Sequence, residues 1–564
     1  MRNRLHQLNS IFVKVFPPTF IFFYSFLLFH CKNTPTDRDH NGLAVLAELQ
    51  SSWVRNFNPL SPSGLARWAT SSGIYEPLFI YNSLSQDFIP WLGLKYSWSK
   101  NNKVLEIILR SGVLWSDGEP FSAKDVSFTY NLVKKYPALD TRDSWSYLDN
   151  VEAVDDTTVE FEFKRAYVPG FYDLVTRSIV PEHLWSEVND PVKFSNPNPV
   201  GTGPFTEIIR FEKQIFELGK NPYYWNRNKP IIEKLVFNAY SGNEAATLAL
   251  INGDLDWTGI FIPSIERVFV QKDPEHHKYW FSPTGYSSYL YLNTTKPFFR
   301  DKNIRKAISY AIDRELMIEV GMYNYMAPAH VTGLSAHNEI WYPPDLEKKE
   351  NWVVYNLDLS NRLLDSLGFL KNDRGYRISS DSSILSFEII CVSGWSDQIR
   401  SAQILSSNLK KIGIDVKVQS FDFGTWISRL QRGEFDMSFG WGDMGGTNPF
   451  RLFKGLMSFE NVKPVGEIAD VNWHRFGLSS ADSLFSIFEE ISDPDRIKSI
   501  IFQLQDLFIE HAPALPINAV ANYAQCNTKY FTNFPSEDNP YTVLAPYSSH
   551  ANLLVLLNLK KRGK

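Results

Sequence analysis

The C-terminal half of the chain alternates segments typical of strands with segments typical of helices. The strand-like segments are LSFEIICV (385–392), IDVKVQSF (414–421) and FDMSFGW (435–441), which are rich in β-branched and aromatic residues. Two segments with helical spacing separate them; we expect Ser396 to cap the first, and Gly413 and Gly433 to end them. Strands joined through single helices form parallel sheets with crossover connections, so we expect an α/β fold.

The chain is too long for one such sheet. Its 564 residues exceed what a single hydrophobic core usually supports, so we expect two or three lobes. Aromatic residues make up 15% of the chain, which fits thick cores or a cleft lined for stacking. The net charge of −5, without a long basic run, argues against nucleic acid as a partner.

The first thirty residues have the pattern of an export signal. Arg2, Arg4 and Lys14 precede an apolar run, Val15 to Phe29, that is too short for a comfortable membrane span. Cys31 and a polar stretch follow, as in bacterial lipoprotein signals, although His30 departs from the usual small residue. We predict a signal peptide over 1–30 and a tether over 31–40. Cys31 would be lipidated, with soluble export or an uncleaved anchor as alternatives.

The stretch RSGVLWSDGEPFSAKDVSFTY (110–130) places three acids near two aromatic residues, as a catalytic subsite would. Each acid has a structural explanation instead. Asp117 precedes a glycine in a pair that favours a tight turn. Ser122 and Asp125 have the spacing of a capping box at the start of a helix, and Glu119 is expected to be solvated. Catalysis needs carboxylates that converge in a pocket, so we predict no catalytic pair here.

The same stretch resembles a signature of the family 5 extracytoplasmic solute-binding proteins of ATP-binding-cassette (ABC) importers, the oligopeptide and dipeptide group. In that family a strand leads into G-V-x-W-S-D-G-x-P-F-[TS]-A-x-D-V, which residues 112–126 match almost throughout. The likeness continues in the family's order at IYEPLFIYN (74–82), NPNPVGTGPF (196–205) and IRKAISYAIDRELM (304–317). It extends over most of the chain.

The resemblance implies an α/β, two-lobed periplasmic-binding-protein-like fold with a small domain inserted in the first lobe. Lobe I would comprise 41–78, 199–285 and 512–564, the inserted domain 79–198, and lobe II 286–511. The implied function is capture of oligopeptides outside the cytoplasmic membrane and delivery to permease subunits. No enzymatic activity, cofactor or metal is expected. We expect a monomer that a lipid anchor holds at the membrane.

The loop after the last predicted strand supplies a candidate anchor for a peptide. In peptide-binding relatives, an aspartate after a Gly-Trp element pairs with the ligand's α-ammonium group, and Asp443, two residues after Trp441, is the matching position. Such a pair is favourable once water is excluded; a solvated loop acid is the alternative. Trp441 is itself a candidate ligand residue, as a stacking surface if the ligand is a sugar. GWGDMG (440–445) also fits a dinucleotide motif, but Asn448 and the proline after it predict a helix start beyond the glycines.

A second set of residues points to oligosaccharides. Dipeptide-binding relatives place an arginine for the ligand carboxylate where this chain has CVSGWSDQ (391–398). Trp395 and Asp397 in that segment resemble family members that bind oligosaccharides, and so do Trp53 and Asn58 in an early W-x-x-N-F-N-P. Tryptophan faces stack on sugar rings, and Asp or Asn can bond hydroxyl groups. Oligosaccharide is therefore the alternative ligand, and core packing is the alternative role for Trp395.

Enzymatic motifs are incomplete in the sequence. The histidine pair at 276–277 has no H-E-x-x-H context, and Ser97-x-x-Lys100 lacks the companion motifs of β-lactamases. Cys391 and Cys526 lie far apart with no other cysteine near them, so we predict no disulfide framework. A secreted hydrolase with an unrecognised site is the distant alternative to a binding protein.

Overall fold

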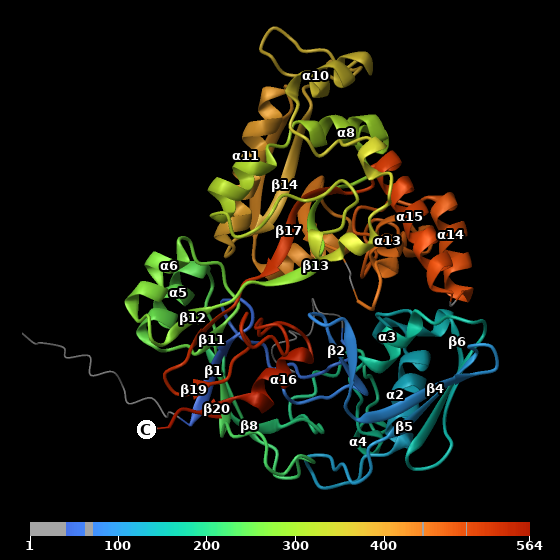
Figure 1. Cartoon of the computed structure of the whole chain (residues 1–564), viewed down its shortest axis with the longest axis vertical. Coiled ribbons are helices and arrows are strands. Elements are labelled where there is room, and N and C mark those ends of the chain that lie inside the picture. The colour runs from blue at the N-terminus through green and yellow to red at the C-terminus, as the bar shows by residue number, and fades with distance from the viewer. Residues whose placement is uncertain (1–40, 62–71, 443–444, 492, 564) are drawn as a thin grey trace, which may run out of the picture. The chain divides into compact units, whose positions relative to one another are not determined.

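The structure is a computed structural model that describes residues 41–61, 72–442, 445–491 and 493–563. The predicted signal peptide and tether, with Cys31, lie outside these residues, and so does Asp443. Three sheets of four or more strands organise the described chain (Figure 1). Within the described ranges, no helix combines the length and apolar character that a membrane span needs.

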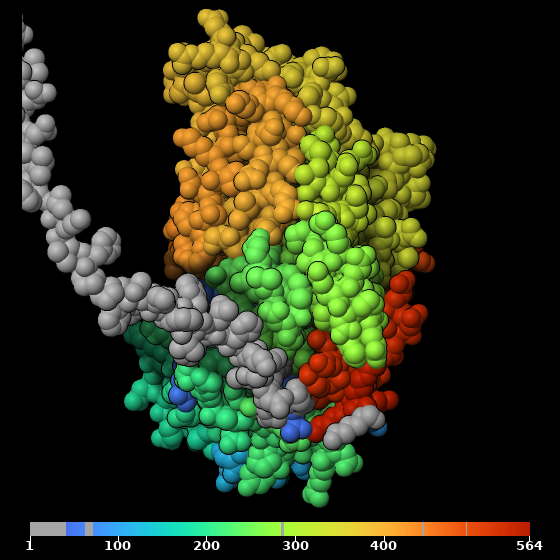
Figure 2. Space-filling view, turned by 90° about the vertical axis from the view of Figure 1, so that its left-hand side faces the viewer, coloured from blue at the N-terminus to red at the C-terminus, as the bar shows by residue number. Residues whose placement is uncertain are grey.

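The first sheet has seven strands and joins the two ends of the described chain. Its order is β12 (His277–Tyr279), β18 (Gln525–Asn527), β11 (Trp257–Thr258), β1 (Gly42–Leu46), β10 (Lys234–Asn238), β9 (Ile215–Lys220), β8 (Phe205–Glu212). β1 is parallel to β10 and β11 and buried along its whole length, as a strand covered on both faces should be. Figure 2 shows the red C-terminal segment against the green segment that carries β11 and β12.

The second sheet has four strands, all antiparallel. Its order is β4 (Gly93–Ser99), β5 (Val104–Leu109), β7 (Thr158–Phe163), β6 (Leu148–Ala153). Helix α2 (Ala123–Lys135) packs on β6 and β7. The hairpin β2 (Phe79–Asn82) and β3 (Asp87–Pro90) and the short helices α3 (Gly170–Val175) and α4 (Glu182–Trp185) complete this part. Its apolar side chains join those of the seven-stranded sheet in one hydrophobic cluster, here called the first core.

The stretch 110–130 has the structural roles that its sequence predicts. Gly118 lies in the turn with φ of +96°. Ser122 caps α2: its hydroxyl accepts from the backbone of Lys124, while the Asp125 carboxylate accepts from the backbone of Ser122 at 2.9 Å. Glu119 is exposed. The turn and the capping box are confirmed, so these acids organise local structure rather than a catalytic pair.

The third sheet has five strands and confirms the predicted strand–helix–strand pattern. Its order is β15 (Asp415–Phe421), β14 (Ser386–Val392), β16 (Met437–Trp441), β13 (Ser282–Leu292), β17 (Leu515–Asn522). β14 is parallel to β15 and β16, and α11 (Ser396–Lys411) and α12 (Phe423–Arg432) connect them. Gly433 ends α12 with φ of +71°, as expected. The predicted cap is wrong: Ser396 is the first helical residue, and Trp395 occupies the N-cap position without a side-chain hydrogen bond.

Helices cover the five-stranded sheet and form a second core with it. They are α8 (Lys302–Tyr310), α10 (Leu357–Ser366), α13 (Phe450–Met457), α14 (Ser479–Glu490) and α15 (Pro494–His511). Strand β17 belongs to this sheet, whereas the predicted boundary at 512 assigns it to lobe I. The other domain limits stay a prediction. The remaining short elements are α5 (Asn243–Asn252), α6 (Ile265–Val268), α7 (Pro297–Arg300), α9 (Arg314–Leu316), α16 (Ala551–Asn558), β19 (Phe531–Thr532) and β20 (Lys560–Lys561).

Candidate functional site

A cavity of about 550 Å³ lies between segments that pack on the first core and segments of the second core. Its first side, here called the polar wall, includes Asn58, Arg142, Arg177, Ser178 and His550. Its second side, here called the aromatic wall, includes Ile427, Trp441 and Trp473, with Asp470 beside them. The volume falls in the range of roughly 300–1,000 Å³ that small-ligand sites occupy. The cavity is therefore the candidate binding site.

The aromatic wall is fixed at the end of β16. Trp441 is 37% exposed, and its ring centroid lies 5.7 Å from that of Trp426 and 5.5 Å from that of Trp473. Gly440 permits this packing, because a Cβ at that position would lie 2.5 Å from a ring carbon of Tyr291. The Tyr291 hydroxyl in turn donates to the backbone oxygen of Trp441 at 2.9 Å. The result is an indole held in place with one part left open, which suits stacking.

Two arginines give the polar wall its charge. Arg177 is 5% exposed and lies 2.8 Å (Nη2 to Oδ1) from Asp140, which is also buried, so this pair balances its own charge. The Nη1 of Arg142 donates to the backbone oxygen of Asp173 and to Oγ1 of Thr176, each at 2.7 Å. Within the described part of the chain, the other N–H groups of Arg142 have no hydrogen-bond partner. Arg142 can therefore receive a ligand carboxylate.

His550 adds a neutral group to the polar wall. It directly precedes α16 with φ of 58°, and its Nε2 lies 3.2 Å from Oγ of Ser178. Burial, and secondarily the charge of Arg142, lowers the pKa of His550 to about 3. The imidazole is consequently uncharged near neutral pH and offers hydrogen bonds without adding to the positive charge of the wall.

Of the predicted ligand residues, Asn58 and Trp441 line the cavity and Trp53 does not. Trp53 is 3% exposed, and its Nε1 donates to the backbone oxygen of Phe237 at 3.0 Å. Its ring and its N–H are both used inside the first core, so its predicted ligand contact is corrected to core packing. Asn58 is buried, and its amide donates to two backbone oxygens at 2.8 and 3.1 Å. It shapes the wall rather than offering free donors.

Trp395 and Asp397 lie at a junction of α5 with α11, apart from the cavity lining. The amide Nδ2 of Asn243 lies 3.2 Å from Oγ of Ser396 there, and Trp395 packs against aromatic residues of the second core. Burial raises the pKa of Asp397 to about 6. Ligand roles for Trp395 and Asp397 stay a prediction, as does the role of Asp443, which lies outside the described residues.

Sequence reasoning finds only Asn58 and Trp441 of the cavity lining; the residues it misses include Arg142, Arg177, Trp473 and His550. They come from separate segments of the chain, and none belongs to a motif with a characteristic spacing. The high aromatic content was a general signal that fits Trp473. The arginines and the histidine carried no signal, because only the tertiary fold brings them to one wall.

Three other features of the described residues are weaker candidates for a functional site than this cavity. A hollow of about 420 Å³ is lined by second-core segments alone, and its Lys296 already pairs with Asp436 at 2.9 Å. No group of three or more His, Cys, Asp or Glu side chains could hold a metal ion in the part of the chain that the structure describes. Strand β16 ends at 441 and α13 begins at 450, so the glycines after β16 do not open a helix as a dinucleotide site requires.

Known proteins are similar to this chain in sequence and in fold. The profile of the bacterial extracellular solute-binding proteins, family 5 middle part, matches residues 87–462. Protein XP55 of Streptomyces lividans is 31% identical over 337 residues, which are 58% of this chain and 57% of that protein, so the chain spans a little over half of this relative. The nickel-binding periplasmic protein of Escherichia coli (strain K12) is 25% identical over 418 residues, 70% of this chain and 74% of that protein.

A solved structure from Thermotoga maritima superposes on almost the whole chain. It is the mannohexaose-bound periplasmic oligopeptide-binding protein of an oligopeptide ABC transporter. Its TM-score is 0.85 at 25% identity, and the match covers 94% of this chain and 100% of that chain. The similarity therefore includes both cores and the segments that form the cavity between them.

Proposed function

Because this chain belongs to the family 5 bacterial extracellular solute-binding proteins, we propose that it captures an oligopeptide outside the cytoplasmic membrane and delivers it to the permease of an ABC importer. The relatives are substrate-binding transport proteins, and the predicted two-lobed α/β fold is confirmed by their structures. The observation that carries the proposal is the cavity of about 550 Å³ between the two cores, with one aromatic and one polar wall. We propose that the protein binds and releases this oligopeptide without changing it chemically.

A peptide suits the cavity through its charge and its side chains. The unpartnered N–H groups of Arg142 match a terminal or side-chain carboxylate, and a charged hydrogen bond of this kind strengthens as water is excluded. The open part of Trp441 suits an apolar or aromatic side chain. The ammonium group would pair with Asp443, which follows Trp441 closely in sequence. This last assignment rests on the sequence alone.

An oligosaccharide is the second candidate, and the aromatic wall favours it. Trp441 and Trp473 form a fixed pair at the cavity, and the neutral His550, Ser178 and Gln431 provide hydrogen-bonding groups for hydroxyls. The Thermotoga maritima relative was solved with mannohexaose bound. Rings that stack on indoles and hydroxyls that bond polar side chains are how sugars bind.

The site of action follows from the family, whose members work outside the cytoplasm. We propose that the mature chain is a monomer held at the membrane by a lipid on Cys31. One acyl chain of myristoyl length binds a membrane only weakly, whereas several acyl chains anchor it stably. The test is Cys31→Ser expressed in the native host. Partition of the variant into detergent exactly as for the wild type would contradict lipidation.

Ligand class and absence of catalysis are tested together. The purified full chain is melted in the presence of a mixed oligopeptide library or of mannohexaose, and each mixture is then analysed for products. A ligand that binds only the folded state raises the melting temperature, by an amount that grows with its concentration. We expect one class to raise it and neither to be consumed. No shift with either class would contradict the assignment of these ligands, and cleavage products would support a hydrolase instead.

A further inference from the structure

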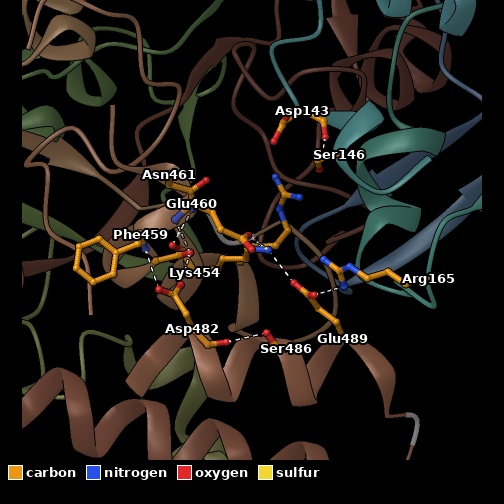
Figure 3. A network of polar contacts seen from close by, with 12 residues as sticks. Asp143, Ser146, Arg165, Lys454, Phe459, Glu460, Asn461, Asp482, Ser486 and Glu489 are labelled. Carbon is orange, nitrogen blue, oxygen red and sulfur yellow. Dashed lines mark hydrogen bonds and ion pairs between the residues drawn. The ribbon is translucent and has the colours of Figure 1, made fainter. Parts of the chain in front are cut away.

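The two cores also meet outside the cavity, along a line of charged side chains here called the ionic seam. From the first-core side it contains Arg165, just after β7, and Asp173 on α3. From the second-core side it contains Arg451 and Lys454 on α13 and Glu489 on α14. None of these five lines the cavity. Figure 3 shows Arg165 and Lys454 both directed at Glu489.

Glu489 is the centre of one half of the seam. Its side chain is only 3% exposed, and it pairs with Arg165 from the other core and with Lys454 from its own, the latter at 2.7 Å. Lys454 also lies 2.9 Å from Glu460. A buried carboxylate with one cation from each core can lose the first and still keep the second. Separation of the cores would therefore not leave this acid buried without a partner.

The other half of the seam has the opposite polarity. Here the cation, Arg451, comes from the second core and the acid, Asp173, from the first. The Arg451 guanidinium also lies 4.8 Å from the ring centroid of Tyr172. Tyr172 packs so closely on Gly445 that a Cβ there would lie 2.5 Å from its ring. Two pairs of opposite polarity fix the register of the two faces, because a shift that misaligns one pair also misaligns the other.

The seam is connected to the cavity through α3. The backbone oxygen of Asp173 accepts the hydrogen bond from Arg142, while the side chain of Asp173 binds Arg451. The same residue therefore touches a cavity arginine and the opposite core. Arg165 is 43% exposed, so the Arg165–Glu489 pair is accessible to salt ions. Ion pairs of this kind hold two faces together reversibly and weaken as ionic strength rises.

From this geometry we propose that Arg165–Glu489 and Arg451–Asp173 form a salt-sensitive latch that biases the ligand-free protein towards a closed form, in which the two cores meet as they do in this structure. The latch acts between the cores and not on the ligand, so it does not depend on the ligand class. Its effect on ligand affinity is indirect, since a binding-competent closed form that is more populated binds with a lower apparent Kd.

The test measures closure directly by single-molecule energy transfer in the ligand-free full chain. Dyes are placed at Lys135→Cys on α2 and Lys498→Cys on α15, both exposed, in a background with Cys31→Ser. The other two cysteines, Cys391 and Cys526, are buried. The latch variant is Arg165→Gln with Arg451→Gln. The matched control is Arg210→Gln, which removes an exposed pair with Glu212 on β8, remote from the second core.

We expect the closed-to-open ratio of the latch variant to fall about tenfold at low salt, since it loses two ion pairs whose arginines are partly exposed. The wild type and the control should approach the variant's ratio as NaCl is raised towards about 1 M, where the screening length is about 3 Å. Circular dichroism and the melting temperature verify that each variant is folded. A latch variant as closed as the wild type at low salt would overturn the proposal. A closed-to-open ratio of the wild type that does not change with NaCl concentration would overturn it as well.

Discussion

The two walls of the cavity are built in different ways. The aromatic wall comes from residues 427–473 of one core, where the indoles hold each other by direct packing. The polar wall comes from distant segments, including Asn58, Arg142, Arg177 and His550, which ion pairs and hydrogen bonds hold in place. Packed rings tolerate the loss of one neighbour, whereas a buried charge does not tolerate the loss of its partner. We therefore expect loss of the buried charge of Arg177 to affect folding, and substitutions of Arg142 or of the exposed Trp441 to affect binding.

The largest effect is expected at Arg177. Arg177→Met leaves the Asp140 carboxylate buried without its cation, and breaking a buried pair in this way typically costs about 3–5 kcal/mol. The free energy of unfolding from urea denaturation measures it. The control is Lys193→Met, which removes a pair with Asp190 that is 86% and 47% exposed and should change stability by less than about 1 kcal/mol. Equal losses in both variants would show that the Arg177 pair is not buried in solution.

The second effect is a dependence of stability on pH through His550. Its pKa is about 3 in the folded protein and about 6.5 in the unfolded chain. Above pH 6.5 the imidazole is neutral in both states, whereas below it the unfolded chain takes up the proton first, so the free energy of unfolding falls as pH drops towards 3. We expect the wild type to lose about 3 kcal/mol more than His550→Gln between pH 7 and pH 4. His474, whose pKa burial also lowers to about 3, stays in both chains and cancels. Parallel curves for the two chains would contradict a neutral His550 in the folded protein.

The third effect separates the ligand classes at the polar wall. If the ligand is a peptide whose carboxylate binds Arg142, Arg142→Met should weaken binding by about 1.5 kcal/mol or more, because a hydrogen bond to a charged group is lost. The C-terminally amidated peptide should bind the wild type and the variant alike. Calorimetry with the peptide found in the melting screen provides the measurement. A loss that is the same for the acid and the amide would remove Arg142 from carboxylate binding.

The smallest effect is expected at the aromatic wall. Trp441→Ala removes a stacking surface but leaves Trp426 and Trp473 in place, so binding of mannohexaose or of a peptide with an aromatic side chain should weaken by about 1 kcal/mol. Stability should change less than in Arg177→Met, because Trp441 is 37% exposed. Trp441→Phe should recover part of the affinity. Unchanged affinity in Trp441→Ala would mean that the ligand does not touch this wall.

The same contrast explains which parts the sequence could predict. The strands around 385–441, the turn at Gly118 and the capping box at Ser122 depend on local spacing, and the structure confirms them. Trp441 is a candidate through the resemblance of its Gly-Trp element to that of peptide-binding relatives, and it does line the cavity at the end of β16. The sequence does not distinguish a tryptophan that packs in a core from one that faces a ligand. Only the fold shows that Trp53 is buried.

The polar wall could not be predicted for a related reason. Arg142 and His550 come from segments far apart in the chain that the tertiary fold brings to one cavity, and no spacing rule encodes that meeting. The same holds for the ionic seam, where Arg165 and Glu489 come from different cores. The position of β17 was also missed, since a strand-like segment alone does not say which sheet it joins.

The central claim is that both walls hold one oligomeric solute in the cavity, and native mass spectrometry of the purified full chain tests it most directly. The wild type should carry a non-covalent adduct whose fragments differ by amino-acid or hexose masses. The double variant Arg142→Met with Trp441→Ala, purified in parallel, should carry little or none, while the Lys193→Met control should match the wild type. An adduct retained by the double variant at wild-type occupancy would contradict binding between these walls.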